Sequence, residues 1–124
     1  MSRIRHYPSP FPVPLSKAVR AGGFLFVSGQ LAMDAQANIV EGDVTVQTRV
    51  VLDRIAATLR EAGASMADVV RVTVWLGNLD DFAAFNEEYR KHFPGDFPAR
   101  STVQAVLYKN AAVEIEVQAL APAA

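Results

Sequence analysis

The sequence has 124 residues, just over half of them hydrophobic, which is enough for one domain spanning residues 1–124 with a real core. A formal net charge of −1 gives no electrostatic attraction for nucleic acid or an anionic membrane, and the absence of cysteine excludes disulfides and thiolate metal sites. Neither histidine has metal-ligand spacing around it, and no segment resembles a signal peptide or a membrane helix, so we expect a soluble cytoplasmic protein without a metal.

The N-terminal part of the chain predicts an extended segment and two strands. Prolines at positions 8, 10, 12 and 14 should hold residues 7–14 extended and non-helical, because proline fixes φ and restrains the residue before it. Residues 16–20 are a candidate short strand that ends at the Gly22-Gly23 turn. Residues 24–28, with the sequence Phe-Leu-Phe-Val-Ser, predict a strong strand because aromatic and β-branched side chains favour this structure.

Two helices are predicted in the middle of the chain. The first begins at Asp43, a good N-cap residue, and runs to Ala62 with apolar residues at helical spacing. Gly63 is well placed as its C-cap. The second helix begins at Asp80 or Asp81 and runs to about residue 93, where Pro94-Gly95 ends it.

Three further strands complete the prediction. Residues 69–76 lie between the helices, and residues 100–107 and 113–120 flank a turn at 108–112. The element order is therefore β-β-α-β-α-β-β. We expect an α+β sandwich in which two helices cover one face of a mixed, mostly antiparallel sheet.

The face of the sheet away from the helices should carry a mixture of residue types. In residues 113–120, apolar side chains alternate with Glu114 and Glu116, so the glutamates should point away from the helices. We place Arg100 and Thr102 on this helix-free face too, because the alternate positions 103, 105 and 107 are apolar. Such a mixed face is typical of an oligomer interface, and interface clefts often bind small ligands. The other residues placed on this face are Phe24, Phe26, Ser28 and Gln104.

Most standard catalytic motifs are absent from the sequence. Gly22-Gly23 lacks the spacing of a dinucleotide-binding or phosphate-binding loop. Ser28-Gly29 follows a strand, but it is not the G-x-S-x-G motif of serine hydrolases, and neither histidine is an obvious base for a serine nucleophile. A serine–histidine hydrolase is therefore not the function that we favour.

Arg100 is the residue best suited to bind a ligand, since a guanidinium can form two parallel hydrogen bonds with a carboxylate. The alternative is a salt bridge to Glu114, to Glu116 or to a neighbouring subunit. Each glutamate is either a solvated strand residue or, within a cleft, a general base toward a water molecule. Asn86 and Tyr89, on the second helix, are most simply a surface polar residue and a packing residue.

Six segments together resemble the YjgF/RidA family. They cover nearly the whole chain from about residue 14, in the family's order and with almost no change in length. The segments are residues 26–30, 47–63, 69–76, 79–89, 97–103 and 113–116. The resemblance implies a chorismate-mutase-like homotrimer with a cleft between each pair of subunits.

The resemblance also implies roles for single residues. Arg100 would hold the substrate carboxylate, the main chain of Thr102 would contact the attacking water, and a strand glutamate would position or activate that water. We favour Glu114 as this glutamate, but the preceding turn is one residue shorter than in the family, and another register would give the role to Glu116. The implied substrate-binding residues are Ser28, Gly29, Asn86 and Leu15. Leu15 stands where the family has a tyrosine, so this wall of the pocket should be more apolar.

The resemblance implies a hydrolase acting on C–N bonds, which converts reactive 2-imino acids, formed from enamines such as 2-aminoacrylate, to 2-keto acids and ammonia. No cofactor is implied, because an iminium carbon is already electrophilic. One alternative is a pathway-specific deaminase of a larger, aminomuconate-like enamine, which Leu15 favours. Another is a non-catalytic module that binds small carboxylates, against which Arg100 and Glu114 together argue. A ribonuclease fits poorly with the near-neutral charge.

Overall fold

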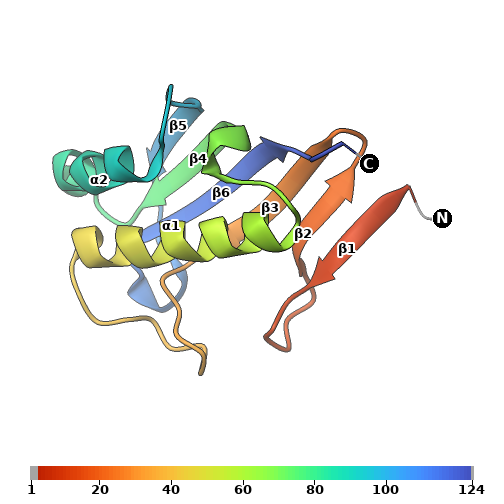
Figure 1. Ribbon diagram of the computed structural model, residues 1–124. Helices are drawn as coiled ribbons and strands as arrows, with labels where there is room; N and C mark the ends of the chain where they lie inside the picture. Colours follow the sequence, from red (N-terminus) through yellow and green to blue (C-terminus); the bar gives the residue numbers. More distant parts are fainter. Residues whose placement is uncertain (1–2, 124) are drawn as a thin grey trace.

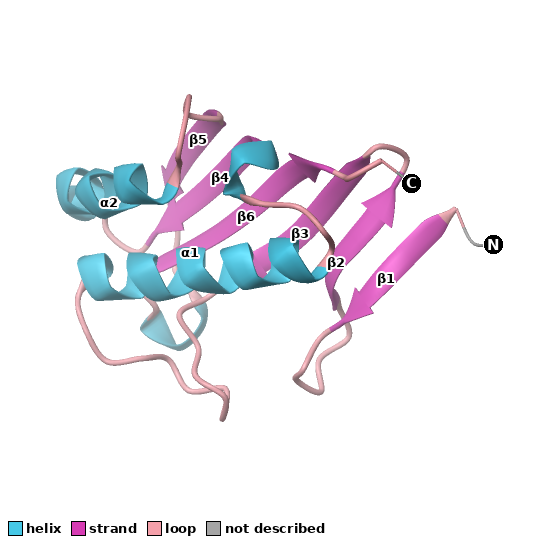
Figure 2. Ribbon diagram, viewed as in Figure 1, coloured by secondary structure: helices cyan, strands magenta, loops and turns pink. Residues whose placement is uncertain are grey.

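The computed structural model of the protein describes residues 3–123, which form one six-stranded sheet with two helices on one face (Figures 1 and 2). The sheet order is β1-β2-β3-β6-β4-β5. All neighbouring strands are antiparallel except β4 and β5, which are parallel. This confirms the α+β class, the mixed sheet and the shared helical face. The bounds are β1 Ile4–Pro8, β2 Ser16–Ala21, β3 Phe24–Gln30, α1 Val44–Glu61, β4 Val69–Leu76, α2 Phe82–Tyr89, β5 Ala99–Gln104 and β6 Val113–Leu120.

The first helix, α1, begins and ends close to the predicted residues. The Asp43 side chain accepts a hydrogen bond from the Val46 amide at 3.1 Å, which caps the helix. Gly63, with φ of +83°, follows the C-cap in the left-handed conformation that glycine adopts most readily. The helix buries a row of apolar residues against the sheet. They are Val51, Leu52, Ile55 and Leu59, facing Val72, Val74, Leu76, Ile115 and Val117.

The second predicted helix has the expected extent but is not uniform. A 3₁₀ turn, Leu79–Asp81, leads into α2, and a second 3₁₀ turn, Arg90–His92, ends it. The α2 helix packs its aromatic residues against each other: the Phe85 and Tyr89 ring centroids are 5.3 Å apart, and those of Tyr89 and Phe93 are 4.7 Å apart. Among the described residues, no helix is both long and apolar enough to cross a membrane.

Two strands differ from the prediction. Residues 4–8 form β1, an additional edge strand paired with β2, where we expected only an extended segment from residue 7. The strand predicted for residues 100–107 ends at Gln104, and it pairs with β4 and not with β6. The two final strands therefore do not form a hairpin, because β4 lies between them.

The predicted orientation of β5 is wrong. Arg100 pairs with Val72 and Thr102 with Val74, so both side chains lie on the helix-covered face with these buried valines. Val103 lies on the helix-free face instead and is 46% exposed. Apolar alternation did not identify the core here, because the helix-free face also carries exposed apolar side chains. The arginine on the helix-free face is Arg71, which donates a hydrogen bond to the Ser101 hydroxyl at 2.8 Å.

Candidate active site in two halves

The first group of candidate residues surrounds Arg100, between β5 and α2. The guanidinium carbon lies 5.6 Å from the Phe82 ring centroid, 5.3 Å from that of Phe85 and 4.8 Å from that of Tyr89. Arginine is weakly hydrated and favours aromatic faces, so this cradle fixes the orientation of the guanidinium. Arg100 and Asn86 also line a pocket of about 240 Å³ together with Tyr89. We call this group the arginine half-site.

The charge of Arg100 has no counterion within the described chain. Among residues 3–123, no carboxylate lies at ion-pair distance from Arg100, and the alternative salt bridge to Glu114 or Glu116 is not formed. A half-buried guanidinium without an anion favours the binding of one. The sequence did not predict the aromatic cradle that holds Arg100, and the ligand-binding role of Arg100 stays a prediction.

Four side-chain polar atoms of the described residues are buried without a hydrogen-bond partner, and three of them belong to α2 or β5 near Arg100: Asn86 Oδ1, the Tyr89 hydroxyl and Thr102 Oγ1. Burial raises the pKa of Tyr89 to about 12, although the nearby charge of Arg100 acts in the opposite direction. The hydroxyl therefore stays protonated at neutral pH and remains a potential donor. Tyr89 was predicted only to pack; it does pack, and it also contacts the Arg100 guanidinium. The spacing of aromatic residues at 82, 85 and 89 on one helix face was the signal for this contact.

The backbone of Thr102 lies at a free edge of the sheet. β5 is the last strand, and the Ala105 amide donates to the Leu76 carbonyl of β4 at 3.0 Å. Because backbone groups alternate in direction along a strand, Arg100 and Thr102 direct their backbone N–H and C=O groups away from β4. The main chain of Thr102 is thus available to a water molecule or a ligand beside the arginine half-site.

The second group of candidate residues surrounds Glu114 on the helix-free face. Glu114 is paired with Trp75, and its carboxylate lies directly against Gly29. Gly29 belongs to an irregularity of β3 between Val27 and Gln30. A Cβ atom at position 29 would overlap the carboxylate oxygen, so only glycine leaves Glu114 in this place. We call this group the glutamate half-site.

Glu114 and Glu116 differ in environment although both are on the same face. Burial raises the pKa of the half-buried Glu114 above its ordinary value, and the charge of Glu116 raises it further. Glu116 itself is exposed. A carboxylate with a raised pKa is a stronger base near neutral pH, so the environment of Glu114 suits the role of general base better.

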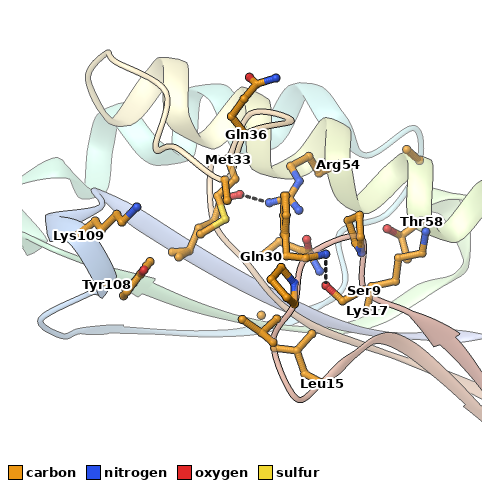
Figure 3. A pocket seen from close by; sticks show the side chains of 18 residues that line it. Ser9, Leu15, Lys17, Gln30, Met33, Gln36, Arg54, Thr58, Tyr108 and Lys109 are labelled. Carbon is orange, nitrogen blue, oxygen red and sulfur yellow. Dashed lines mark hydrogen bonds between the residues drawn. The ribbon is translucent and has the colours of Figure 1, made fainter.

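Ser28 and Leu15 lie close to the glutamate half-site. The Ser28 hydroxyl donates to the Ser16 carbonyl at 2.6 Å and so ties β3 to β2. Leu15 is half exposed and lines, together with Gly29, a second pocket of about 650 Å³ (Figure 3). The structure therefore brings Leu15, Ser28, Gly29 and Glu114 into one region of the fold.

The two half-sites do not meet within one chain. Arg100 and Glu114 lie on opposite faces of the sheet, and β4 separates their strands. Two strand spacings put the backbones of β5 and β6 about 10 Å apart. A single chain thus provides the arginine half-site and the glutamate half-site, but it does not bring them together into the complete predicted site. Nowhere in residues 3–123 do three histidine, aspartate or glutamate side chains gather as a metal site requires.

Comparison with known proteins identifies the family. The family described as "Endoribonuclease L-PSP" matches residues 9–121. The chain is 45% identical over 111 residues to a RutC family protein of Pyrococcus abyssi, and 40% identical over 111 residues to a protein of Dermatophagoides farinae named 2-iminobutanoate/2-iminopropanoate deaminase. Each alignment covers 87% of both chains. The structure of RidA from an Antarctic Psychrobacter species superimposes with a TM-score of 0.84 at 34% identity, over 97% of this chain and 99% of that one. The chain therefore belongs to this family, the YjgF/RidA family that its motifs resemble.

Proposed function

We propose that the protein is a cofactor-independent imine deaminase that hydrolyses 2-imino acids to 2-keto acids and ammonia. The observation that carries the proposal is Arg100, whose guanidinium is held on three aromatic rings and has no anion of its own within residues 3–123. A substrate carboxylate supplies that anion. The relative from Dermatophagoides farinae, which is named 2-iminobutanoate/2-iminopropanoate deaminase, supports the same reaction class.

The reaction begins when a water oxygen bonds to the iminium carbon while Glu114 accepts a proton from the water. Arg100 holds the carboxylate beside this carbon and withdraws charge from it, and the backbone of Thr102 orients the water. The resulting amino alcohol receives a proton on nitrogen. The C–N bond then breaks with its electron pair on nitrogen, ammonia leaves, and loss of the hydroxyl proton forms the keto group.

The proposed site is shared between subunits of a homotrimer. Arg100, Asn86 and Thr102 come from one subunit, and Glu114 with its neighbours Ser28, Gly29 and Leu15 comes from the next. This arrangement joins two half-sites that one sheet keeps apart. The helix-free face also has the apolar character of an interface. Its exposed apolar side chains include Phe24 at 44%, Phe26 at 42%, Val103 at 46% and Leu120 at 48% exposure.

A second candidate is the deamination of a larger enamine or imine. The pocket beside Leu15 has a volume of about 650 Å³, which is far more than a three-carbon imino acid fills. This observation concerns the substrate and not the chemistry, because the same Arg100 and Glu114 serve both candidates.

The proposal is tested by ammonia release from freshly generated 2-imino acids in a coupled assay. We expect the wild-type protein to accelerate release, and Arg100→Lys to lose most of the acceleration, because an ammonium cannot form the two parallel hydrogen bonds of a guanidinium. Arg60→Lys, at an exposed position of α1, is the matched control and should keep wild-type activity. Full activity of Arg100→Lys, or no acceleration by the wild type with any imino acid, would contradict the proposal.

A further inference from the structure

The larger pocket lies between α1, the proline-rich segment 9–15 and the loop after β3 (Figure 3). Its walls are mostly apolar, with Phe11, Val13, Leu15 and Met33 among the lining residues. Among the described residues, three cationic side chains also line the pocket, and no aspartate or glutamate does. The cations are Lys17, Arg54 and Lys109. An apolar pocket with only positive charge on its walls favours a ligand that is apolar along its length and anionic at one point.

Arg54 is the cation whose charge is both fixed and uncompensated. Figure 3 shows its side chain extending from α1 into the pocket beside Met33. Its Nη1 donates to the Leu31 carbonyl at 2.5 Å, and its guanidinium carbon lies 5.8 Å from the Phe11 ring centroid. No carboxylate among residues 3–123 lies at ion-pair distance from it. By contrast, Lys17 is paired with Glu61 at 2.5 Å.

The hydrogen bond to Leu31 does not account for an arginine at this position. A guanidinium carries five N–H donors, and this bond uses one of them. Burial lowers the pKa of Arg54, since the charged form loses water without gaining an anion. A neutral hydrogen-bond donor would be enough to hold the Leu31 carbonyl in the loop after β3, so this bond does not require an unpaired charge in an apolar pocket. An anionic ligand group would satisfy the remaining donors and offset the desolvation.

The pocket is also connected to the proposed chemistry. Gly29 lines the pocket, and the Glu114 carboxylate lies against the same glycine. Leu15 lines the pocket and also lies close to the glutamate half-site. A substrate carbon held beside Glu114 would therefore have its side chain directed toward this volume.

We propose that the pocket receives the substrate side chain, and that the preferred substrates are 2-imino acids with a long chain that ends in a second carboxylate, which Arg54 binds. This inference rests on the proposed deaminase function. It assigns Arg100 to the carboxylate next to the reacting carbon and Arg54 to the distal one.

The test compares two imino acids of similar length, generated in the assay by amino acid oxidases. One is made from 2-aminoadipate and ends in a carboxylate, and the other is made from norleucine and ends in a methyl group. We expect wild-type kcat/KM to favour the dicarboxylate. Arg54→Met, which keeps an unbranched chain of similar bulk, should reduce the ratio of kcat/KM for the dicarboxylate to that for the norleucine imine by on the order of a hundredfold. Arg54→Lys should keep part of the preference for the dicarboxylate over the norleucine imine, and Arg60→Met, on the same helix, should keep all of this preference.

The outcomes separate this inference from the function on which it rests. If the norleucine imine is hydrolysed but the ratio is the same in wild type and Arg54→Met, the inference is wrong and the deaminase function stands. If no imino acid is hydrolysed, the deaminase function fails, and calorimetry with 2-oxoadipate then tests the pocket alone. Binding that Arg54→Met loses and Arg54→Lys partly retains would support the assignment of Arg54. Equal binding by all three proteins would overturn it.

Discussion

Glu114 and Glu116 show how the surroundings of a residue determine its chemistry. The two carboxylates are two positions apart on one face of β6, yet only Glu114 is packed against backbone, at Gly29. Burial is the larger cause of its raised pKa, and the charge of Glu116 is the smaller. The sequence left the choice between the two glutamates open, and the packing of Gly29 favours Glu114.

Glutamine substitutions should separate the roles of the two glutamates. Glu114→Gln removes the proposed base and should reduce kcat/KM by a factor on the order of 10²–10⁴. The reaction requires the charged carboxylate, so wild-type activity should fall as the pH drops through the raised pKa of Glu114. Glu116→Gln removes one cause of the increase in pKa. Its pH–rate profile should keep the full plateau, with the acidic limb displaced to lower pH. A Glu116→Gln profile that superimposes on the wild-type profile would show that the two carboxylates do not interact.

Leu15 should influence which substrate is preferred. It lines the large pocket as an apolar residue where the family resemblance implies a tyrosine. Leu15→Tyr reduces the pocket volume and adds a hydroxyl, so the ratio of kcat/KM for a small imino acid to that for a bulky one should rise by on the order of tenfold. The ratio is measured by competition between the imino acids of alanine and norleucine. An unchanged ratio would mean that the Leu15 side chain does not contact the substrate.

At the scale of elements, a buried carboxylate joins the two helices. Glu88 of α2 is 3% exposed, and its carboxylate accepts hydrogen bonds from Arg49 of α1 at 3.1 Å and from His92 at 2.8 Å. Burial alone would raise the pKa of Glu88. The hydrogen bonds from His92 and Arg49, with the charges of Arg49 and Lys91, outweigh this effect and lower the pKa. Because its pKa is lower in the folded state, the ionised Glu88 stabilises the fold.

Glu88→Gln should therefore destabilise the protein by about 1–3 kcal/mol at neutral pH, measured by urea unfolding at a fixed protein concentration. The stabilisation is present above the ordinary carboxyl pKa of 4.5 and is lost as the pH falls toward the lowered folded value, so the difference from wild type should shrink below pH 4.5. Glu87→Gln, at the neighbouring exposed position, should change stability by less than about 0.5 kcal/mol. A difference for Glu88→Gln that stayed constant with pH would rule out this ionic contribution.

Local signals predicted most elements, and long-range pairing accounts for the failures. The Asp43 cap, the Gly63 terminus and the extent of β4 depend on neighbouring residues, and the structure confirms them. The β1 strand was missed because its pairing with β2 is not encoded within residues 4–8 themselves. The face of β5 was wrong because it depends on the register with β4 and not on the apolar alternation of β5 alone.

At the scale of the whole molecule, the candidate site was predicted as a set of residues but not as an arrangement. The motifs predicted Arg100, Glu114, Thr102, Asn86 and Gly29 as site residues. The motifs could not show that Arg100 and Glu114 lie on opposite faces of the sheet, because a linear motif carries no information about which face a residue occupies. The proposed homotrimer resolves this separation, and light scattering at micromolar concentration should give the mass of three chains. A monomer would contradict the shared site.

The most direct test of the shared site is complementation between two inactive chains. Arg100→Lys and Glu114→Gln chains are co-expressed with different tags, and the mixed oligomers are purified by both tags in turn. Where an intact Arg100 from one chain meets an intact Glu114 from the other, the site is wild type. A ring of three that contains both kinds of chain has one such interface among its three, so the doubly purified trimers should show about a third of wild-type deaminase activity per site. If mixed oligomers form but remain as inactive as either parent, Arg100 and Glu114 act within one chain or not together, and the site is not shared between subunits.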